Sequence, residues 1–305
     1  MRKLSTKYLI TRMKRFGTFR ILLSPYITKK SKKFGKTFRS FDGTSIYYEC
    51  WKTKTKKLPF VFIHGLSGNL TGWQKIARHF YKKGHSCLLL DLRGHGYSDS
   101  SLPLKKYNIA SATRDLELIL KRENVSKAVI FAHCMGSLIA VEFTYRNRKI
   151  VEKLILFSPE LQPQASRRVR IGGKIAFSVL SAIKPIWKKA EKYPRQINLQ
   201  KTKGRLDVDL YTINDFTSMD PDIYLQYFSE ILQFNAIPHF LKLKKPMLII
   251  HGKRDIIFNY ISSYNLANEI SNLEFVLLPN VNHHVPINAA MDCITFIENF
   301  LSDKK

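Results

Sequence analysis

A cysteine at the centre of a short motif could supply a nucleophile. The motif Ala132-His133-Cys134-Met135-Gly136 follows the apolar run Ala128–Phe131. Small residues at both ends of the motif let a strand turn sharply into a helix, and that turn holds the central side chain strained and exposed. Serine is the usual central residue, and a thiol keeps the same covalent chemistry. The motif therefore predicts covalent catalysis through Cys134.

A carboxylate and a base that could activate this thiol follow two later strands. Asp255 comes after the apolar run Met247–Ile250, and His283 comes after Leu273–Leu278. Loops at the carboxyl ends of parallel strands meet at one edge of a sheet. We therefore predict that Asp255 orients the His283 imidazole, which in turn activates Cys134.

Two of these positions have alternatives, and other groups complete the predicted site. His284 could be the base in place of His283, and Glu160, which follows another strand, could be the acid or could simply begin an insertion. The backbone amides of Leu66 and Met135 are predicted to stabilise an oxyanion. Three further histidines are expected to shape the pocket: His64, His133 and His284. We expect no metal ion and no cofactor, because the cysteines and histidines lack metal-ligand spacing.

Strand and helix patterns alternate along most of the chain. Strands are predicted at 37–41, 44–51, 59–64, 86–90, 127–132, 152–157, 246–250 and 273–278, the first two joined by a turn at Asp42-Gly43. Helices are predicted at 73–83, 109–122, 135–146, 260–270 and 289–301, with Asp115 on the polar side of its helix. Apolar strands in this alternation predict an α/β fold, with a mostly parallel sheet covered by helices on both faces.

A long insertion interrupts the alternation. We predict a basic leader at 1–36, a core in two parts at 37–159 and 242–305, and between them a helical cap over the site at 160–241. Prolines are expected to break the helices of this cap: Pro185, Pro194, Pro221 and Pro238.

The cap contains an apolar stripe on a cationic helix. Its members recur every four residues, with lysines between them: Ile171, Ile175, Val179, Ile183 and Trp187. Packing of this stripe against the core is the favoured interpretation. The alternative is a helix that docks on acidic lipid or lines an acyl-binding groove.

The net charge of +28 is concentrated in two segments. Residues 1–41 contain no acid, and Glu191 is the only acid between Arg167 and Arg205. Such charge predicts peripheral contact with an anionic membrane through residues 1–36 and the cap, although a lysine-rich composition alone could explain it. Specific nucleic-acid recognition is not expected, since no matching motif accompanies the lysines. The expected partner in the site is a small acyl substrate, and the oligomeric state is left open.

The cysteines and the apolar runs bear on the compartment. The four cysteines have no CxxC spacing, which favours a reducing compartment, and no run of about 18 apolar residues could span a membrane. The expected location is cytoplasmic, with peripheral membrane contact, and an organelle-targeting leader is the alternative.

Another motif, Asp91-Leu92-Arg93-Gly94-His95-Gly96-Tyr97-Ser98, completes a family resemblance. With the motifs above, it makes the chain resemble the α/β-hydrolase fold superfamily from about residue 38 to residue 301. The resemblance implies triad positions for Cys134, Asp255 and His283, and oxyanion positions for Leu66 and Met135. Ala132 departs from the commoner glycine, and Cys134 departs from the usual serine.

The resemblance also implies an activity. We expect a hydrolase of esters or thioesters that works through a cysteine acyl-enzyme. Dienelactone hydrolases and polyhydroxyalkanoate synthases of this superfamily use cysteine, whereas its haloalkane-opening members use aspartate at this position. The alternatives are an acyltransferase of polyester-synthase type, a noncatalytic receptor for a small apolar ligand, and a membrane-associated scaffold.

Overall fold

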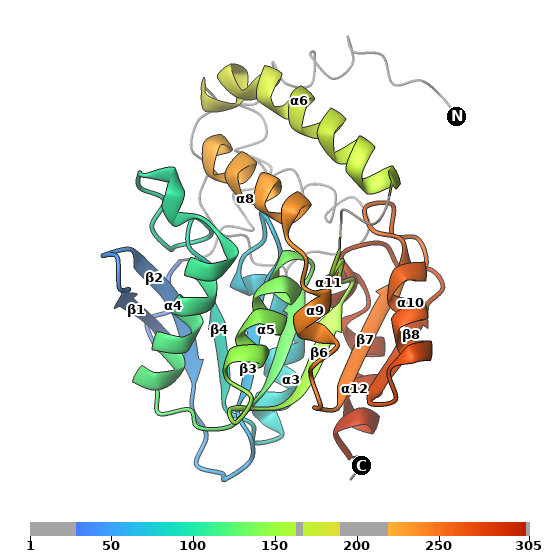
Figure 1. The fold of residues 1–305 in the computed structure, drawn as a ribbon. Coiled ribbons are helices and arrows are strands. Elements are labelled where there is room, and N and C mark those ends of the chain that lie inside the picture. Colours follow the sequence, from blue (N-terminus) through green and yellow to red (C-terminus); the bar gives the residue numbers. More distant parts are fainter. Residues whose placement is uncertain (1–28, 163–166, 190–218, 303–305) are drawn as a thin grey trace.

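The computed structural model describes residues 29–162, 167–189 and 219–302. Most of the predicted leader, as well as Pro194, lies outside the described residues. The described chain forms one sheet with helices on its two faces and a helical layer beyond one end (Figure 1).

The sheet has eight strands in the order β1-β2-β4-β3-β5-β6-β7-β8. β2 runs antiparallel to both β1 and β4, and all other neighbours are parallel. The strands are β1 (Gly35–Arg39), β2 (Ser45–Trp51), β3 (Phe60–Ile63), β4 (Cys87–Leu90), β5 (Ala128–His133), β6 (Val151–Phe157), β7 (Met247–Gly252) and β8 (Leu273–Leu278). The predicted fold class is confirmed.

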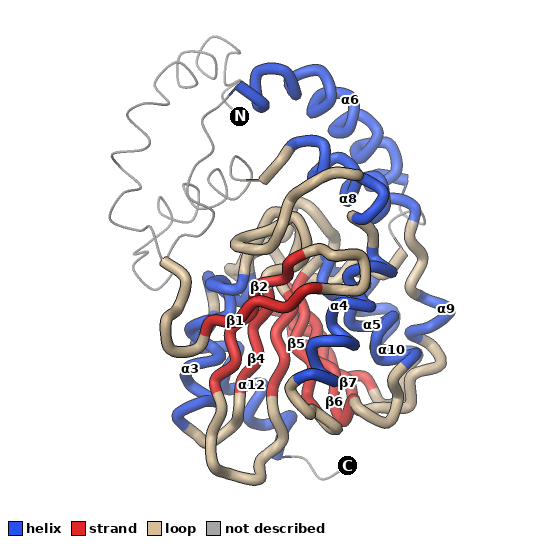
Figure 2. Tube along the Cα trace, turned by 90° about the vertical axis from the view of Figure 1, so that its left-hand side faces the viewer, coloured by secondary structure: helices blue, strands red, loops and turns tan. Residues whose placement is uncertain are grey.

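Helices cover both faces, as Figure 2 shows in the view along the sheet. One face carries α3 (Gln74–Lys82) and α12 (Ala290–Ser302), and the other carries α4 (Ile109–Arg122) and α5 (Met135–Arg146). α10 (Tyr260–Glu269) packs on β7 and β8, while the short α11 (Val285–Asn288) contacts α12. The helices α4, α5 and α10 come after β4, β5 and β7, as the alternation predicted.

Successive strand residues belong to different cores because strand side chains alternate between faces. In β3, Val61 and Ile63 join one hydrophobic core, and Phe60 and Phe62 join the other. Both faces are buried, which explains why this strand is apolar throughout rather than alternating.

The prediction for Asp115 is wrong. This residue is buried and does not lie on an exposed polar side of α4. Arg93, which is also buried, donates to both carboxylate oxygens of Asp115 at 2.7 Å, and Ser40 donates to Oδ1. Arg93 comes from the loop after β4, so α4 buries a charge that a residue outside the helix compensates.

The insertion between β6 and β7 contains α6 (Arg167–Lys189), α8 (Pro221–Gln233) and α9 (Ile237–Phe240). α8 lies over one end of the sheet, and α6 lies beyond α8 (Figures 1 and 2). Pro221 and Pro238 stand in the first turns of α8 and α9, as expected of prolines at helix starts. The expected break at Pro185 is wrong: α6 continues through it, since a proline removes one intrahelical hydrogen bond without always ending the helix.

The favoured interpretation of the α6 stripe is also wrong for the members whose side chains are described. Ile171, Ile175 and Val179 are all exposed. The side of α6 that packs on α8 is instead offset from the stripe, and it includes Gly173. No helix in the described ranges is both long and apolar enough to span a bilayer.

Candidate active site

Cys134 stands at the turn between β5 and α5 in a strained backbone conformation. Its φ is +51° and its ψ is −121°, a region that residues with a side chain rarely adopt. The turn is possible because Gly136 lies against the end of β3. A Cβ atom at Gly136 would come within 2.7 Å of the Ile63 carbonyl oxygen. The predicted need for a small residue at this position is confirmed.

Asp255 lies in the loop after β7, and both of its carboxylate oxygens accept hydrogen bonds. Oδ1 accepts from the amides of Ile257 and Phe258, each at 2.9 Å. Oδ2 accepts from Nδ1 of His283 at 2.7 Å and lies 3.3 Å from Nε2 of His251. Burial alone would raise the pKa of Asp255, but the hydrogen bonds from the two histidines hold that pKa far below its ordinary value. Asp255 is therefore a fixed carboxylate.

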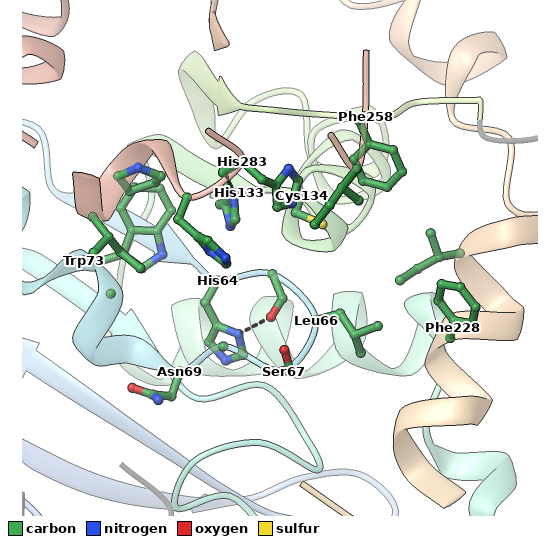
Figure 3. A pocket seen from close by; sticks show the side chains of 18 of the residues that line it. His64, Leu66, Ser67, Asn69, Trp73, His133, Cys134, Phe228, Phe258 and His283 are labelled. Atoms are coloured by element: carbon green, nitrogen blue, oxygen red, sulfur yellow. Dashed lines mark hydrogen bonds between the residues drawn. The ribbon is translucent and has the colours of Figure 1, made fainter. Parts of the chain in front are cut away.

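His283 lies between Asp255 and Cys134. Figure 3 shows the His283 ring next to the Cys134 side chain. Burial would lower the pKa of the His283 imidazole, but attraction to the Cys134 thiolate and hydrogen bonds with Asp255 and Cys134 outweigh burial and raise this pKa to about 10. The arrangement therefore places a charged imidazole beside the Cys134 sulfur.

The structure separates these residues from their predicted alternatives. The hydrogen bond to the Asp255 carboxylate comes from Nδ1 of His283. Glu160 is buried and accepts from the Gln162 amide, and burial raises its pKa. His284 lines the pocket instead, where burial and the charge of His283 lower its pKa to about 4.

The loop after β3 passes directly beside Cys134. A Cβ atom at Gly65 would lie 2.9 Å from Cβ of Cys134, so only a glycine permits this approach. Leu66 follows in the same loop and lines the pocket. In the part of the chain that the structure describes, the amides of Leu66 and Met135 make no hydrogen bond of their own. Both remain available to an oxyanion, which is the role predicted for them.

Two buried neutral histidines hold this loop in place. The Leu92 amide donates to Nε2 of His64 at 3.0 Å, so Nδ1 carries the hydrogen and donates to the Gly65 carbonyl at 2.8 Å. The Ser67 amide donates to Nε2 of His95 at 3.2 Å. Burial lowers the pKa of both imidazoles, that of His95 to about 4. His64 was predicted to shape the pocket, and here it also fixes the loop that carries Leu66.

The motif from Asp91 to Ser98 also fixes the backbone next to this loop. Asp91 accepts from the amides of Leu70 and Tyr97, each at 2.8 Å. A Cβ atom at Gly96 would overlap the Asp91 carboxylate, and the φ of +53° at Gly96 favours glycine as well. The motif thus contributes to the site indirectly, because its contacts fix the conformation of the backbone beside the site.

Two more histidines contact the loops that carry Asp255 and His283. Nε2 of His133 donates to the His283 carbonyl oxygen at 2.9 Å, and the His133 ring lines the pocket. His251 is fully buried against Asp255. The sequence analysis missed His251 as a site residue, although its spacing of four residues from Asp255 was a usable signal.

A cavity of about 210 Å³ opens over Cys134 and His283. Most of its walls are apolar, and the sequence analysis did not identify the side chains that the insertion contributes, such as Tyr224 and Phe228 of α8. Leu66, Trp73 and Phe258 also line the pocket (Figure 3). Further lining residues are Ile231, Ile257 and Pro286. Such a pocket suits an apolar group whose reactive atom reaches the thiol.

Within the described ranges, no three His, Cys, Asp or Glu side chains are grouped as a metal ion requires. Cys50, Cys87 and Cys293 are free thiols that lie apart from the site. Burial raises the pKa of each of these three, which makes them poor nucleophiles.

Comparisons with known proteins agree with the fold. A putative esterase/lipase of Haemophilus influenzae is 26% identical over 247 residues, which are 79% of this chain and 82% of that protein. An sn-1-specific diacylglycerol lipase of Danio rerio is 25% identical over 302 residues, 90% of this chain and 88% of that protein. Among solved structures, an esterase from Exiguobacterium antarcticum is 17% identical with a TM-score of 0.72, covering 88% of this chain and 100% of the esterase.

The family described as alpha/beta hydrolase fold matches residues 59–290, from β3 to the beginning of α12. That range contains the loop of Leu66, the cysteine turn and the loops of Asp255 and His283. The chain belongs to the α/β hydrolase fold family.

Proposed function

We propose that this protein hydrolyses carboxylic esters or thioesters through an acyl-enzyme on Cys134. One observation carries the proposal: Asp255 hydrogen-bonds His283, and His283 contacts Cys134 in the lining of an apolar pocket. The relatives named esterase/lipase and diacylglycerol lipase support ester substrates.

Acylation begins when the Cys134 thiolate adds to the carbonyl carbon of the bound ester. The amides of Leu66 and Met135 donate to the oxyanion that forms. When the tetrahedral intermediate collapses, the bond to the leaving oxygen breaks and that oxygen takes the proton of the His283 imidazolium. The products of this step are an alcohol, a thioester on Cys134 and a neutral His283.

Deacylation uses the same groups, but His283 now acts as a base instead of an acid. Neutral His283 removes a proton from water, and the hydroxide adds to the thioester carbonyl carbon. The intermediate then expels the Cys134 thiolate and releases the carboxylic acid. Asp255 remains ionised throughout and stabilises the imidazolium.

Steady-state hydrolysis of short p-nitrophenyl esters and acyl-CoA thioesters tests the proposal. We expect Cys134→Ala to reduce kcat at least about 1000-fold, as loss of a nucleophile does, with unchanged circular dichroism. Cys50→Ala is the matched control, and it should retain activity because Cys50 lies apart from the pocket. Retained turnover in Cys134→Ala would refute the mechanism.

Cys134→Ser tests whether the other groups of the site support hydrolysis when a hydroxyl replaces the thiol. We expect the serine variant to hydrolyse esters, because the base, the acid and the oxyanion amides are unchanged. Stable acylation of the wild type by acyl-CoA, with transfer to alcohols but not to water, would indicate the acyltransferase instead. Binding of an apolar ester without any acylation would indicate the receptor.

A further inference from the structure

The outward side of α6 carries an exposed apolar stripe. Ile171 is 46% exposed, Ile175 is 60% exposed and Val179 is 55% exposed. The three residues occur at every fourth position, so their side chains lie along one side of the helix. Large aliphatic side chains are seldom left in water in a row on one element, which indicates that this side meets another apolar phase.

Contacts with α8 fix the orientation of α6. Gly173 lies against Leu232, where a Cβ atom would come within 2.6 Å of that side chain. Further along the helix, Nζ of Lys184 lies 2.7 Å from Oδ1 of Asp222. α6 is therefore seated on α8 by a side other than the stripe, and the exposure of the stripe follows from this packing.

Charge indicates what the stripe meets. The α6 sequence contains no acid and seven basic residues: Arg167, Arg168, Arg170, Lys174, Lys184, Lys188 and Lys189. A helix with an aliphatic stripe among basic residues matches the interface of a bilayer, where acyl chains lie beneath anionic headgroups. Lys174, next to the stripe, is exposed.

A second exposed patch lies at the same end of the sheet. Ile256 is 96% exposed in the loop after β7, beside exposed Lys253 and Arg254. Its neighbour Ile257 lines the active-site pocket. The combination of aliphatic and basic side chains thus recurs in a loop that is independent of α6 in the sequence and forms part of the pocket wall.

We propose that the outward side of α6 docks on an anionic phospholipid bilayer, with Ile171, Ile175 and Val179 in the headgroup layer. α6 forms the outermost layer above the site (Figures 1 and 2), so docking turns this end of the molecule toward the lipid. The docking goes beyond the proposed activity and does not require it.

Sedimentation with sucrose-loaded vesicles tests the docking on the full-length chain. The vesicles contain either phosphatidylcholine alone or phosphatidylcholine with about 30% phosphatidylglycerol, whose negative surface charge attracts basic segments. The wild type should bind the anionic vesicles, and salt should weaken that binding. Because the leader is also basic, binding by the wild type alone does not identify α6, and variants must be compared.

Ile175→Asp is the diagnostic variant. It removes an aliphatic side chain from the bilayer and adds a repelled charge, and it should weaken partitioning onto anionic vesicles about tenfold. Leu241→Asp is the matched control: Leu241 is 55% exposed but precedes β7, at the opposite end of the sheet. This control should bind as the wild type does. Hydrolysis of a short soluble ester should be the same in all three proteins.

Three outcomes would overturn the docking. In the first, Ile175→Asp binds anionic vesicles as tightly as Leu241→Asp does. In the second, the wild type does not bind anionic vesicles. In the third, light scattering shows that the wild type is a dimer that does not bind vesicles and that Ile175→Asp dissociates it. The last result would assign the stripe to a second copy of the chain. Because Cys134→Ala should bind vesicles normally, failure of the proposed activity would leave the docking intact.

Discussion

At the scale of single residues, the protonation of His283 decides how Cys134 reacts. The raised pKa of this imidazole, about 10, keeps it charged across the neutral range. Its charge stabilises a neighbouring thiolate, which is the reactive form of cysteine. Cys134 should therefore behave differently from the other three cysteines.

Alkylation by iodoacetamide tests this property. At pH 7 we expect iodoacetamide to alkylate Cys134 faster than the other three cysteines, whose pKa values burial raises. His283→Ala should slow alkylation of Cys134, because it removes the charged imidazole beside the sulfur. Peptide mapping assigns the label, and equal labelling of Cys134 in the wild type and in His283→Ala would contradict this role of His283.

His251 offers a second prediction at this scale, because it contacts the triad without contacting the substrate pocket. Its Nε2 lies 3.3 Å from Oδ2 of Asp255, the oxygen that holds His283. His251→Phe should lower kcat about tenfold and leave KM unchanged, as loss of a positioning partner does. His284→Ala is the comparison: His284 lines the pocket, so this change should act mainly on KM. A change in KM alone for His251→Phe would argue against the positioning role.

At the scale of elements, the site depends on how closely the loop after β3 approaches the cysteine turn. Gly65→Ala would place a Cβ atom 2.9 Å from Cβ of Cys134 and push the Leu66 amide out of position. We expect kcat to fall about 100-fold, the usual effect of losing one oxyanion donor, while the protein stays folded. Gly172→Ala, where a Cβ atom meets open space, should leave activity unchanged. Equal activity in the two variants would show that this loop does not stabilise the oxyanion.

The same scale shows what sequence patterns can and cannot predict. The strands and helices of the core were predicted within a few residues, because apolar runs and helical spacing report burial directly. The predicted triad residues meet because parallel strands align the loops that carry them. Asp115 was misplaced because its partner, Arg93, comes from another loop. The α6 stripe was misread because spacing marks an apolar side without naming what covers it.

At the scale of the whole molecule, buried histidines set the pH range of stability. Burial lowers the pKa of His95 and of His284 to about 4, from 6.5. Above pH 6.5 these groups are neutral whether folded or unfolded. As the pH falls from 6.5 toward 4, only the unfolded chain takes up protons, and His95 alone would cost at most about 3 kcal/mol of folding free energy.

His283 acts in the opposite direction, since its pKa is raised. Its stabilising contribution is complete below pH 6.5 and is lost as the pH rises toward 10. Thermal unfolding should therefore show its highest midpoint near neutral pH, with a fall on the acid side. His95→Gln should flatten that acid limb, and a midpoint unchanged between pH 7 and pH 4.5 would contradict the neutral, buried histidines.

The central claim is that Cys134 carries the acyl group, and peptide mass spectrometry tests it most directly. The wild type is mixed with p-nitrophenyl butyrate, quenched in acid within the first turnovers and digested. The account predicts one butyryl group on the peptide that contains Cys134, and none on that peptide in Cys134→Ala. Hydrolysis with the acyl group on another residue, or with no acylated peptide while Cys134→Ala remains active, would contradict it.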